Sequence, residues 1–110
     1  MANKVVVVGK VSGEPFLTTN KSDNPLLKFV IEEQHNWTGQ QKQTRSKTIE
    51  HKVLMWGPMA TSLAEEIAAG DIVLVDGMLE YYEFEDPSRG GKMTKIAQIN
   101  ARQVNVLKKA

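Results

Sequence analysis

Apolar and polar side chains alternate with a period of two through most of this chain, and that alternation is typical of half-buried β-strands. Leu27, Phe29 and Ile31 alternate with Lys28 and Glu32 in a strand that we expect to start near residue 26. Four further segments show the same alternation or a short β-branched run. They are residues 5–8, 48–56, 72–84 and 93–107, the last with an expected interruption near Asn100. The pattern predicts five strands.

Glycine and proline mark where the strands bend and where they end. Gly9 predicts a bend or bulge in the first strand, and Gly77 predicts a bulge in the fourth. Residues 87–91 (Pro-Ser-Arg-Gly-Gly) predict a tight hairpin turn. Residues 12–15 and 18–25 are rich in turn-forming residues and predict loops. Residues 38–47 contain no aliphatic side chain and predict a long exposed loop.

Only one segment has the spacing of a helix. Met59, Leu63 and Ile67 are four residues apart and predict one apolar helical face. Pro58 suits the first helical position, and Gly70 is placed to end the helix. The order is therefore strand-strand-strand-helix-strand-strand. It predicts an all-β fold, a five-stranded OB-fold Greek-key barrel with one helix between strands three and four, a fold associated with oligonucleotide binding.

The composition limits the remaining classes. The 110 residues suffice for one domain, which we place at residues 1–110. The chain has no cysteine, which excludes disulfides and a thiol nucleophile. Its apolar runs are too short for a signal peptide or a membrane span, so we expect a cytoplasmic, nucleoid-associated protein. The net charge is only +1, yet residues 76–86 hold five acids and no base, and the residues from 89 onward hold six bases and no acid.

Several stretches, taken in order, resemble the bacterial single-stranded DNA-binding proteins over nearly the whole chain. They are residues 3–11, the strand that ends at residues 36–37, residues 51–57, and the stretch that continues through Ala64 to residues 70–79, followed by Phe84. The resemblance implies single-stranded DNA binding with little sequence preference, in DNA replication, recombination or repair. It places Trp37, Trp56 and Phe84 where that family stacks bases. It also places Lys52 at a phosphate-contacting position and His51 at a position tied to subunit association, and we expect a homo-oligomer, either a dimer or a tetramer.

The residues themselves support this interpretation. Alternation puts Lys52 on the strand face of Trp56, so a base can stack on the indole while its phosphate meets the ammonium group. The lysine and arginine residues of the long loop add an electrostatic attraction to DNA that does not depend on the nucleotide sequence. Tyr81 or Tyr82 can share or take over the role of Phe84. The candidate DNA-binding residues are Trp37, Trp56, Phe84, Lys52, Tyr82, Lys10, Lys42, Arg45 and Lys47.

The chain also departs from that family. Glu50 stands where a further stacking tryptophan is usual, and Glu80 and Glu83 stand where basic residues are common. Carboxylates near phosphate predict weaker or more salt-sensitive binding. Family members usually continue into an acidic, partner-recruiting tail. This sequence stops at Ala110, so we do not expect recruitment of replication or repair proteins by that route.

Two other readings remain open at this point. A tail-less OB protein similar to primosomal replication protein N would join DNA binding to a helicase partner. A metal-dependent nuclease is the other, but the acids of residues 76–86 are typical of a solvated face. His35 has no second histidine at a metal-ligand spacing, and Gly9-Lys10 is an incomplete phosphate loop. We therefore expect no enzyme, no catalytic residue, no metal site and no cofactor.

Overall fold

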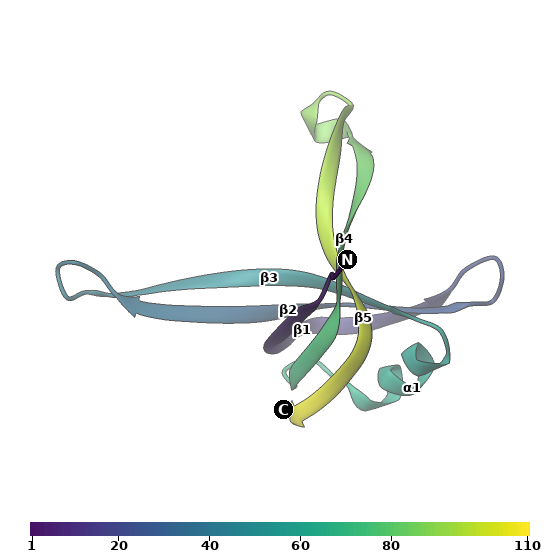
Figure 1. The fold of residues 1–110 in the computed structure, drawn as a ribbon, viewed down its shortest axis with the longest axis horizontal. Helices are drawn as coiled ribbons and strands as arrows, with labels where there is room; N and C mark the ends of the chain where they lie inside the picture. The colour runs from purple at the N-terminus through teal and green to yellow at the C-terminus, as the bar shows by residue number, and fades with distance from the viewer.

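The computed structural model describes all of residues 1–110 and is built almost entirely from long strands (Figure 1). It has five strands, as the period-two pattern predicts, and a single α-helix that packs against the barrel they form. A short 3₁₀ turn, Pro87–Arg89, connects the last two strands. In chain order the elements are β1 (Val5–Thr19), β2 (Pro25–Thr38), β3 (Thr44–Trp56), α1 (Pro58–Glu66), β4 (Ile72–Asp86) and β5 (Lys92–Lys108). No helix is long and apolar enough to span a membrane.

The strands close into a barrel in the order β1-β2-β3-β5-β4, with β4 returning to β1. All neighbours are antiparallel except β3 and β5, which meet in parallel over Val53↔Ile99 and Leu54↔Asn100. This is the predicted five-stranded barrel with a helix between its third and fourth strands. Closure leaves no free sheet edge in the barrel wall, so the strands can extend beyond it only as paired hairpins.

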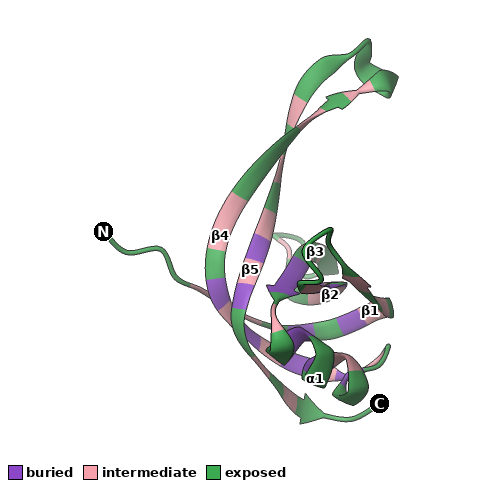
Figure 2. Ribbon diagram, turned by 90° about the vertical axis from the view of Figure 1, so that its right-hand side faces the viewer, coloured by how far each residue is buried: buried purple, intermediate pink, exposed green.

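The core occupies the barrel interior and continues to the helix. Leu27, Phe29 and Ile31 of β2, the predicted inward set, are all buried. Ala60, Leu63 and Ile67 close the barrel from the helix side. Figure 2 shows that the buried residues gather around the barrel and the helix, whereas the strands that leave it are exposed. Each fully buried Leu, Ile or Val side chain contributes roughly 1.5–3 kcal/mol of transfer free energy, so stability comes from the barrel and not from its extensions.

Three hairpins project from the barrel: β1–β2, β2–β3 and β4–β5 (Figure 1). The β2–β3 hairpin corrects the loop predicted at residues 38–47. Strand pairing continues to Thr38↔Thr44, and only residues 39–43 form the turn. The segment is polar because water reaches both faces of the hairpin, and polarity of this kind resembles a loop in sequence. Its exposure was predicted correctly.

The first predicted loops need a similar correction. Residues 12–15 lie inside β1, as a bulge across which the pairing shifts from Ser12↔Val30 to Phe16↔Lys28. Of residues 18–25, only 20–24 form a turn. Gly9 is regularly paired with Val73, so the predicted bulge is not at Gly9. Instead, a Cβ atom at Gly9 would lie 2.7 Å from the carbonyl oxygen of Glu32, so glycine is required there by close approach of two backbones.

The β4–β5 register shifts between Asp76 and Gly77, where the sequence predicts a bulge, but the extra residue is in β5 and not in β4: the single step from Asp76 to Gly77 spans two residues, from Gln103 to Ala101. A side chain at Gly77 would collide with the backbone of Asn100. The interruption that the sequence predicts near Asn100 is absent from β5. The strand passes through Asn100 without a break, and its register against β4 shifts at two other places, between Ala101 and Gln103 and between Val106 and Lys108. Asn100 resembles a breaker in sequence, but pairing with Met78 holds it in the strand.

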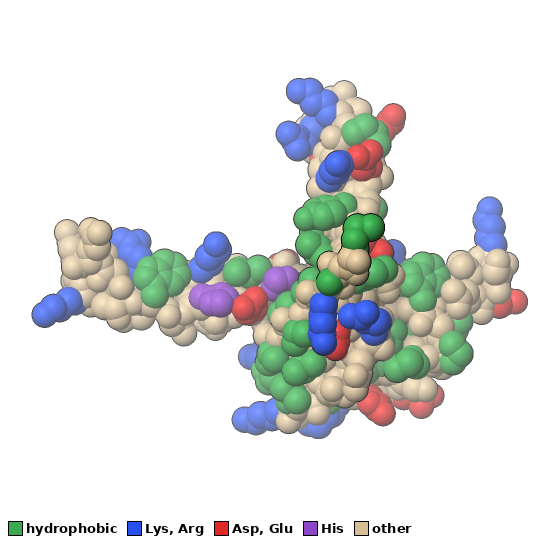
Figure 3. Space-filling view, viewed as in Figure 1, with side chains coloured by type: hydrophobic (Ala, Val, Ile, Leu, Met, Phe, Trp, Pro, Cys, Tyr) green, Lys and Arg blue, Asp and Glu red, His purple; other side chains and the backbone are tan.

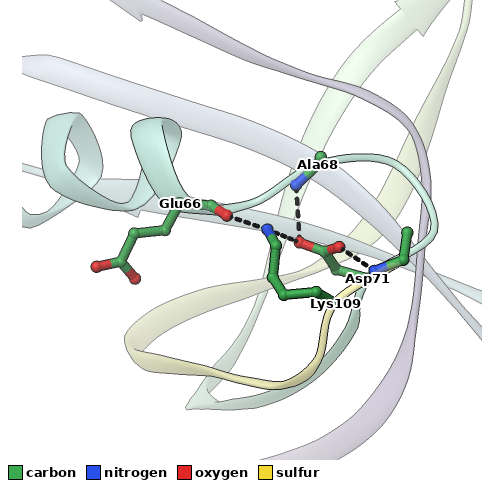
Figure 4. A network of polar contacts seen from close by, with 5 residues as sticks. Glu66, Ala68, Asp71 and Lys109 are labelled. Carbon is green, nitrogen blue, oxygen red and sulfur yellow. Dashed lines mark hydrogen bonds and ion pairs between the residues drawn. The ribbon is translucent and has the colours of Figure 1, made fainter.

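The helix begins as predicted but ends early. Pro58 occupies its first turn, whereas Ile67 is already extended, with φ −94° and ψ 148°. Gly70, expected to end the helix, lies in the turn after it, with φ 93°, and its amide donates to Val11. Buried Asp71 then accepts hydrogen bonds from the amides of Ala68 and Ala110 and from the ammonium group of Lys109 (Figure 4). These contacts, and not a glycine cap, fix the helix end. Met59, on the predicted apolar face, is 56% exposed.

Candidate nucleic-acid interface

A groove with a volume of about 600 Å³ crosses the outer face of β1, β2 and β3 and reaches the root of the β4–β5 hairpin. Its apolar surface includes Leu26, Val30 and Leu54, and Trp56 lies at one end of this set. Tyr82 of β4 and Gln98 of β5 line the side of the groove that the β4–β5 hairpin forms. We call this feature the β1–β3 groove. It combines an aromatic ring, apolar surface and charged side chains in one concave site.

Strand alternation decides which residues face this groove. Because Leu27, Phe29 and Ile31 point into the core, their even-numbered neighbours point outward. The register pairs Leu26 with Trp56, Lys28 with Leu54 and Val30 with Lys52. Trp56 and Lys52 therefore share one face, as the sequence predicts, and Lys28 lies on the same face one strand away. Trp56 is 40% exposed, which leaves its ring accessible to a ligand.

The two lysines of the groove are free to meet an anion. The lysine and arginine residues that form ion pairs are Lys4, Lys95, Arg102 and Lys109. Neither Lys28 nor Lys52 is among them. An unpaired ammonium group can neutralise a phosphate without first breaking an internal contact, and each such contact adds sequence-independent affinity.

Two more aromatic rings extend from the groove along the β4–β5 hairpin. Tyr82 and Phe84 share one face of β4, with ring centroids 6.2 Å apart and a tilt of 36°. Tyr82 lines the groove and is 38% exposed. Tyr81, the alternative that the sequence left open, points to the opposite face of the strand. Tyr82 is therefore the residue placed to act together with Phe84.

Trp37 lies elsewhere, on the β2–β3 hairpin. It has the same strand parity as Leu27 and Phe29, so it faces the opposite side of the ribbon from Trp56. Arg45 stands directly across from Trp37, and Lys47 stands across from His35. Lys42 lies in the turn at the tip, with φ 61°. Figure 3 shows lysine and arginine side chains spaced along this hairpin, with the two histidines nearer the barrel.

The root of the β2–β3 hairpin carries a linked set of one carboxylate and two imidazoles. Glu33 lies between them, with its Oε1 atom 2.9 Å from Nε2 of His51 and its Oε2 atom 2.7 Å from Nε2 of His35. The hydrogen bond with His51, followed by that with His35, lowers the pKa of Glu33 below its ordinary value. The side chain of His51 is only 24% exposed. The sequence did not pair His51 with His35, because Glu33 joins them across two strands.

Two glutamates, Glu32 and Glu50, form an acidic row on the outer face between the β1–β3 groove and the β2–β3 hairpin. Glu32 and Glu50 are directly opposite each other in the β2–β3 register, and Lys10 of β1 is opposite Glu32. None of the three forms an ion pair. Two like charges at opposed positions repel each other and also repel a polyanion. Lys10, a predicted DNA contact, lies at this row and lines a separate hollow with Val8 and Glu33.

The structure also brings together residues that we had not singled out. Lys28 was visible in the strand alternation, and its parity with Leu26 would have placed it beside Trp56. Gln98 and Glu14 had no such signal, because their approach to the groove depends on the β3–β5 contact and on the β1 bulge. No group of three or more histidine, aspartate or glutamate side chains in residues 1–110 is arranged to hold a metal ion.

Comparison with known proteins adds to this geometry. A model of the single-strand binding protein family matches residues 2–107. The chain is 27% identical over 105 residues to the single-stranded DNA-binding protein of Aquifex aeolicus, a match that covers 96% of this chain and 71% of that relative. It is 24% identical over 96 residues to single-stranded DNA-binding protein 2 of Streptococcus agalactiae, covering 87% of this chain and 72% of that relative.

Solved structures have the same fold. A Plasmodium falciparum single-stranded DNA-binding protein in complex with single-stranded DNA superposes with a TM-score of 0.82 at 18% identity, covering 100% of this chain and 96% of that chain. A deletion mutant of the single-stranded DNA-binding protein from Thermus aquaticus gives a TM-score of 0.81 at 23% identity, covering 97% of this chain and 51% of that chain.

Proposed function

The chain belongs to the single-strand binding protein family, and from this membership and the β1–β3 groove we propose that it binds single-stranded DNA with little sequence preference. Base stacking and phosphate contacts supply the affinity. Both interactions are largely indifferent to base identity, because every base has a π-face and every nucleotide a phosphate. The processes served are those general to this family: DNA replication, recombination and repair.

One observation carries the proposal: an accessible indole and two unpaired ammonium groups lie in a single groove. Trp56 offers a stacking platform worth about 1–3 kcal/mol per base. Lys52 and Lys28 lie on the same face, within reach of the phosphates that flank a stacked base. Tyr82 and Phe84 continue the aromatic surface along the β4–β5 hairpin.

We assign a second contact region to the β2–β3 hairpin. Trp37 has Arg45 across from it, Lys47 lies two residues further along β3, and Lys42 lies in the turn at the tip of the hairpin. Since Trp37 and Trp56 face opposite sides of the ribbon, a bound strand meets both only by passing around the hairpin. Lys10 contributes positive charge at the acidic row. Binding and coating of DNA need no bond-breaking chemistry, so this role is non-enzymatic and needs no cofactor, and we place it in the cytoplasm at the nucleoid.

We also propose that the protein is a homo-oligomer, either a dimer or a tetramer, with His51 at a subunit contact. Val6 and Val8 of β1 are 52% and 46% exposed, which leaves apolar surface on the barrel wall. Val8 and Glu33 line one hollow, and Glu33 bonds to His51. Val8 therefore lies in the same hollow as the carboxylate that holds His51.

Tryptophan fluorescence tests the DNA-binding proposal directly. Saturating oligo-dT should quench the emission, because both tryptophans are proposed stacking platforms. Trp37→Phe and Trp56→Phe variants report the two regions separately, and each should retain part of the quench. Oligo-U should be compared with oligo-dT at two salt concentrations, and both affinities should fall as salt rises. Unchanged emission at saturation in the parent protein, with binding seen by another method, would refute both stacking assignments.

A further inference from the structure

The β1 bulge brings an acidic side chain to the β1–β3 groove. Between Ser12 and Phe16, β1 advances four residues while β2 advances two, from Val30 to Lys28. Gly13, with φ 73°, permits the turn that accommodates the extra residues. Glu14, the next residue, lines the groove. Its carboxylate takes part in none of the hydrogen bonds or ion pairs within the chain, so it is an uncommitted acceptor.

A second acceptor faces the groove from β5. The amide nitrogen of Gln98 donates to Glu80 across the β4–β5 ladder, with an Nε2–Oε1 distance of 2.9 Å. A carboxylate only accepts, so Glu80 fixes which end of the Gln98 amide it binds. The carbonyl oxygen of Gln98 is left for a ligand, because no donor in the chain reaches it. Asn100 donates to the other oxygen of Glu80 at 3.5 Å and helps to hold Glu80 in place.

These acceptors flank the cations of the groove. The strand order β1-β2-β3-β5 places Glu14 and Gln98 on the outer strands, with Lys28 and Lys52 between them. Phosphates are served by the ammonium groups and are repelled by Glu14. Among the groups of a bound DNA strand, the hydrogen-bond donors on the nucleobases are the partners that suit these acceptors. Cytosine, adenine and guanine carry an exocyclic amino group, whereas thymine presents a carbonyl oxygen where cytosine has its amino group. The one N–H donor of thymine and uracil lies between two carbonyl oxygens, which repel a carboxylate that approaches it.

We infer that Glu14 and Gln98 give the groove a preference for amino-bearing bases over thymine and uracil, superimposed on base-independent stacking. This inference rests on the proposed function. Stacking holds bases in the groove without regard to their identity, and each acceptor then distinguishes the edge of the base that lies beside it. Glu80 acts as a positioning residue, because it holds the amide of Gln98 with its oxygen toward the ligand.

Competition between oligo-dC and oligo-dT of equal length, near pH 8 and at constant salt, tests the inference. We expect Glu14→Ala to lower the ratio of dC to dT affinity by roughly 5- to 10-fold. The dC complex loses a hydrogen bond to a charged acceptor, while the dT complex loses a repulsion. Glu14→Gln should lower the ratio less, since an amide can accept from cytosine or donate to thymine. Glu80→Gln should also lower it, because the Gln98 amide becomes free to turn over.

Glu65→Ala is the matched control, since it removes the same charge from exposed helix surface outside the groove. It should change both affinities by one common factor. If Glu14→Ala likewise changes dC and dT by a common factor, Glu14 acts through charge alone and the inference is wrong. If the parent protein binds neither oligonucleotide, the proposed function itself fails, which is a separate outcome.

Discussion

Glu50 and Trp56 lie on the same face of β3 and have opposite effects on a polyanion. Trp56 offers a ring for stacking, whereas Glu50 stands opposite Glu32 and places two carboxylates beside each other at the end of the groove. The residues between them on this face, Lys52 and Leu54, belong to the groove. Glu50 thus lies at the end of the surface that favours binding of a polyanion.

Replacing Glu50 tests whether this face meets DNA. Glu50→Trp removes a repulsion and adds a stacking platform, so we expect binding of oligo-dT to strengthen by about 1–3 kcal/mol. Glu50→Gln removes only charge, and its smaller gain should fade as salt rises. Titrations at two salt concentrations measure both effects.

Glu32→Gln is the matched control, because Glu32 occupies the same row on β2 and should behave as Glu50→Gln does. If Glu50→Trp and Glu50→Gln both bind oligo-dT no better than the parent protein at low salt, Glu50 does not face the DNA. The assignment of this face to nucleic acid would then be wrong.

At the scale of elements, the barrel and its hairpins are stabilised differently. The barrel has a buried core, whereas the hairpins have backbone pairing with both faces exposed (Figure 2). The helix contacts the barrel through only a few buried residues, so its C-terminal end needs a separate attachment. Asp71 supplies it by joining the segment after the helix to the end of β5 through Ala68, Lys109 and Ala110 (Figure 4).

This attachment predicts a sensitivity to acid. Hydrogen bonds, first from Lys109 and then from the amide of Ala110, lower the pKa of Asp71 below its ordinary value of 3.8. A carboxyl whose pKa is lower in the folded state stabilises the fold at pH values above 3.8. That contribution is lost as pH falls through the depressed pKa. The free energy of unfolding should therefore decrease as the pH falls below 3.8.

Urea unfolding at pH 7 and across the acid range tests this prediction. Asp71→Asn should be less stable than the parent at pH 7, and the difference between the two proteins should shrink with acid. Glu65→Gln, an exposed carboxylate on the helix, serves as the control and should follow the parent at every pH. A constant difference between Asp71→Asn and the parent across the range would contradict the role of the Asp71 charge.

At the scale of the whole molecule, the exposed side chain of Val8 and the carboxylate of Glu33, which contacts His51, line one hollow beside β1. The hollow lined by Val8 and Glu33 lies where β1 leaves β2, because their pairing begins only at Lys10↔Glu32. Small barrels with such surface are commonly completed by a second copy of the same chain.

Light scattering at micromolar concentration tests this arrangement, and we expect the mass of a dimer or a tetramer. Val8→Lys places a charge on this exposed apolar surface and should lower the mass. His51→Ala should weaken the association by removing a side chain from the proposed subunit contact. Met59→Lys is the control, because Met59 is similarly exposed on the helix, and it should leave the mass unchanged. A monomeric parent protein at this concentration would exclude the proposed oligomer.

The sequence by itself determined the class of fold and part of the interface. Period-two alternation, Pro58 at the helix start and Gly77 at the bulge are local signals, since each depends on neighbours a few residues away. The same alternation placed Trp56 and Lys52 on one face, and it would have added Lys28. The lengths of the hairpins were not predicted, because polar pairing with water on both faces has the composition of a loop.

Only the tertiary structure decided which distant residues meet. The link between His51 and His35 through Glu33, the opposition of Glu32 and Glu50, and the approach of Glu14 and Gln98 to one groove all depend on strand register. Register is set by how the whole barrel packs and closes, and a shift by one residue would turn every side chain of a strand to the other face. The spacing of neighbouring residues does not predict the register, because the partner strands come from distant parts of the chain.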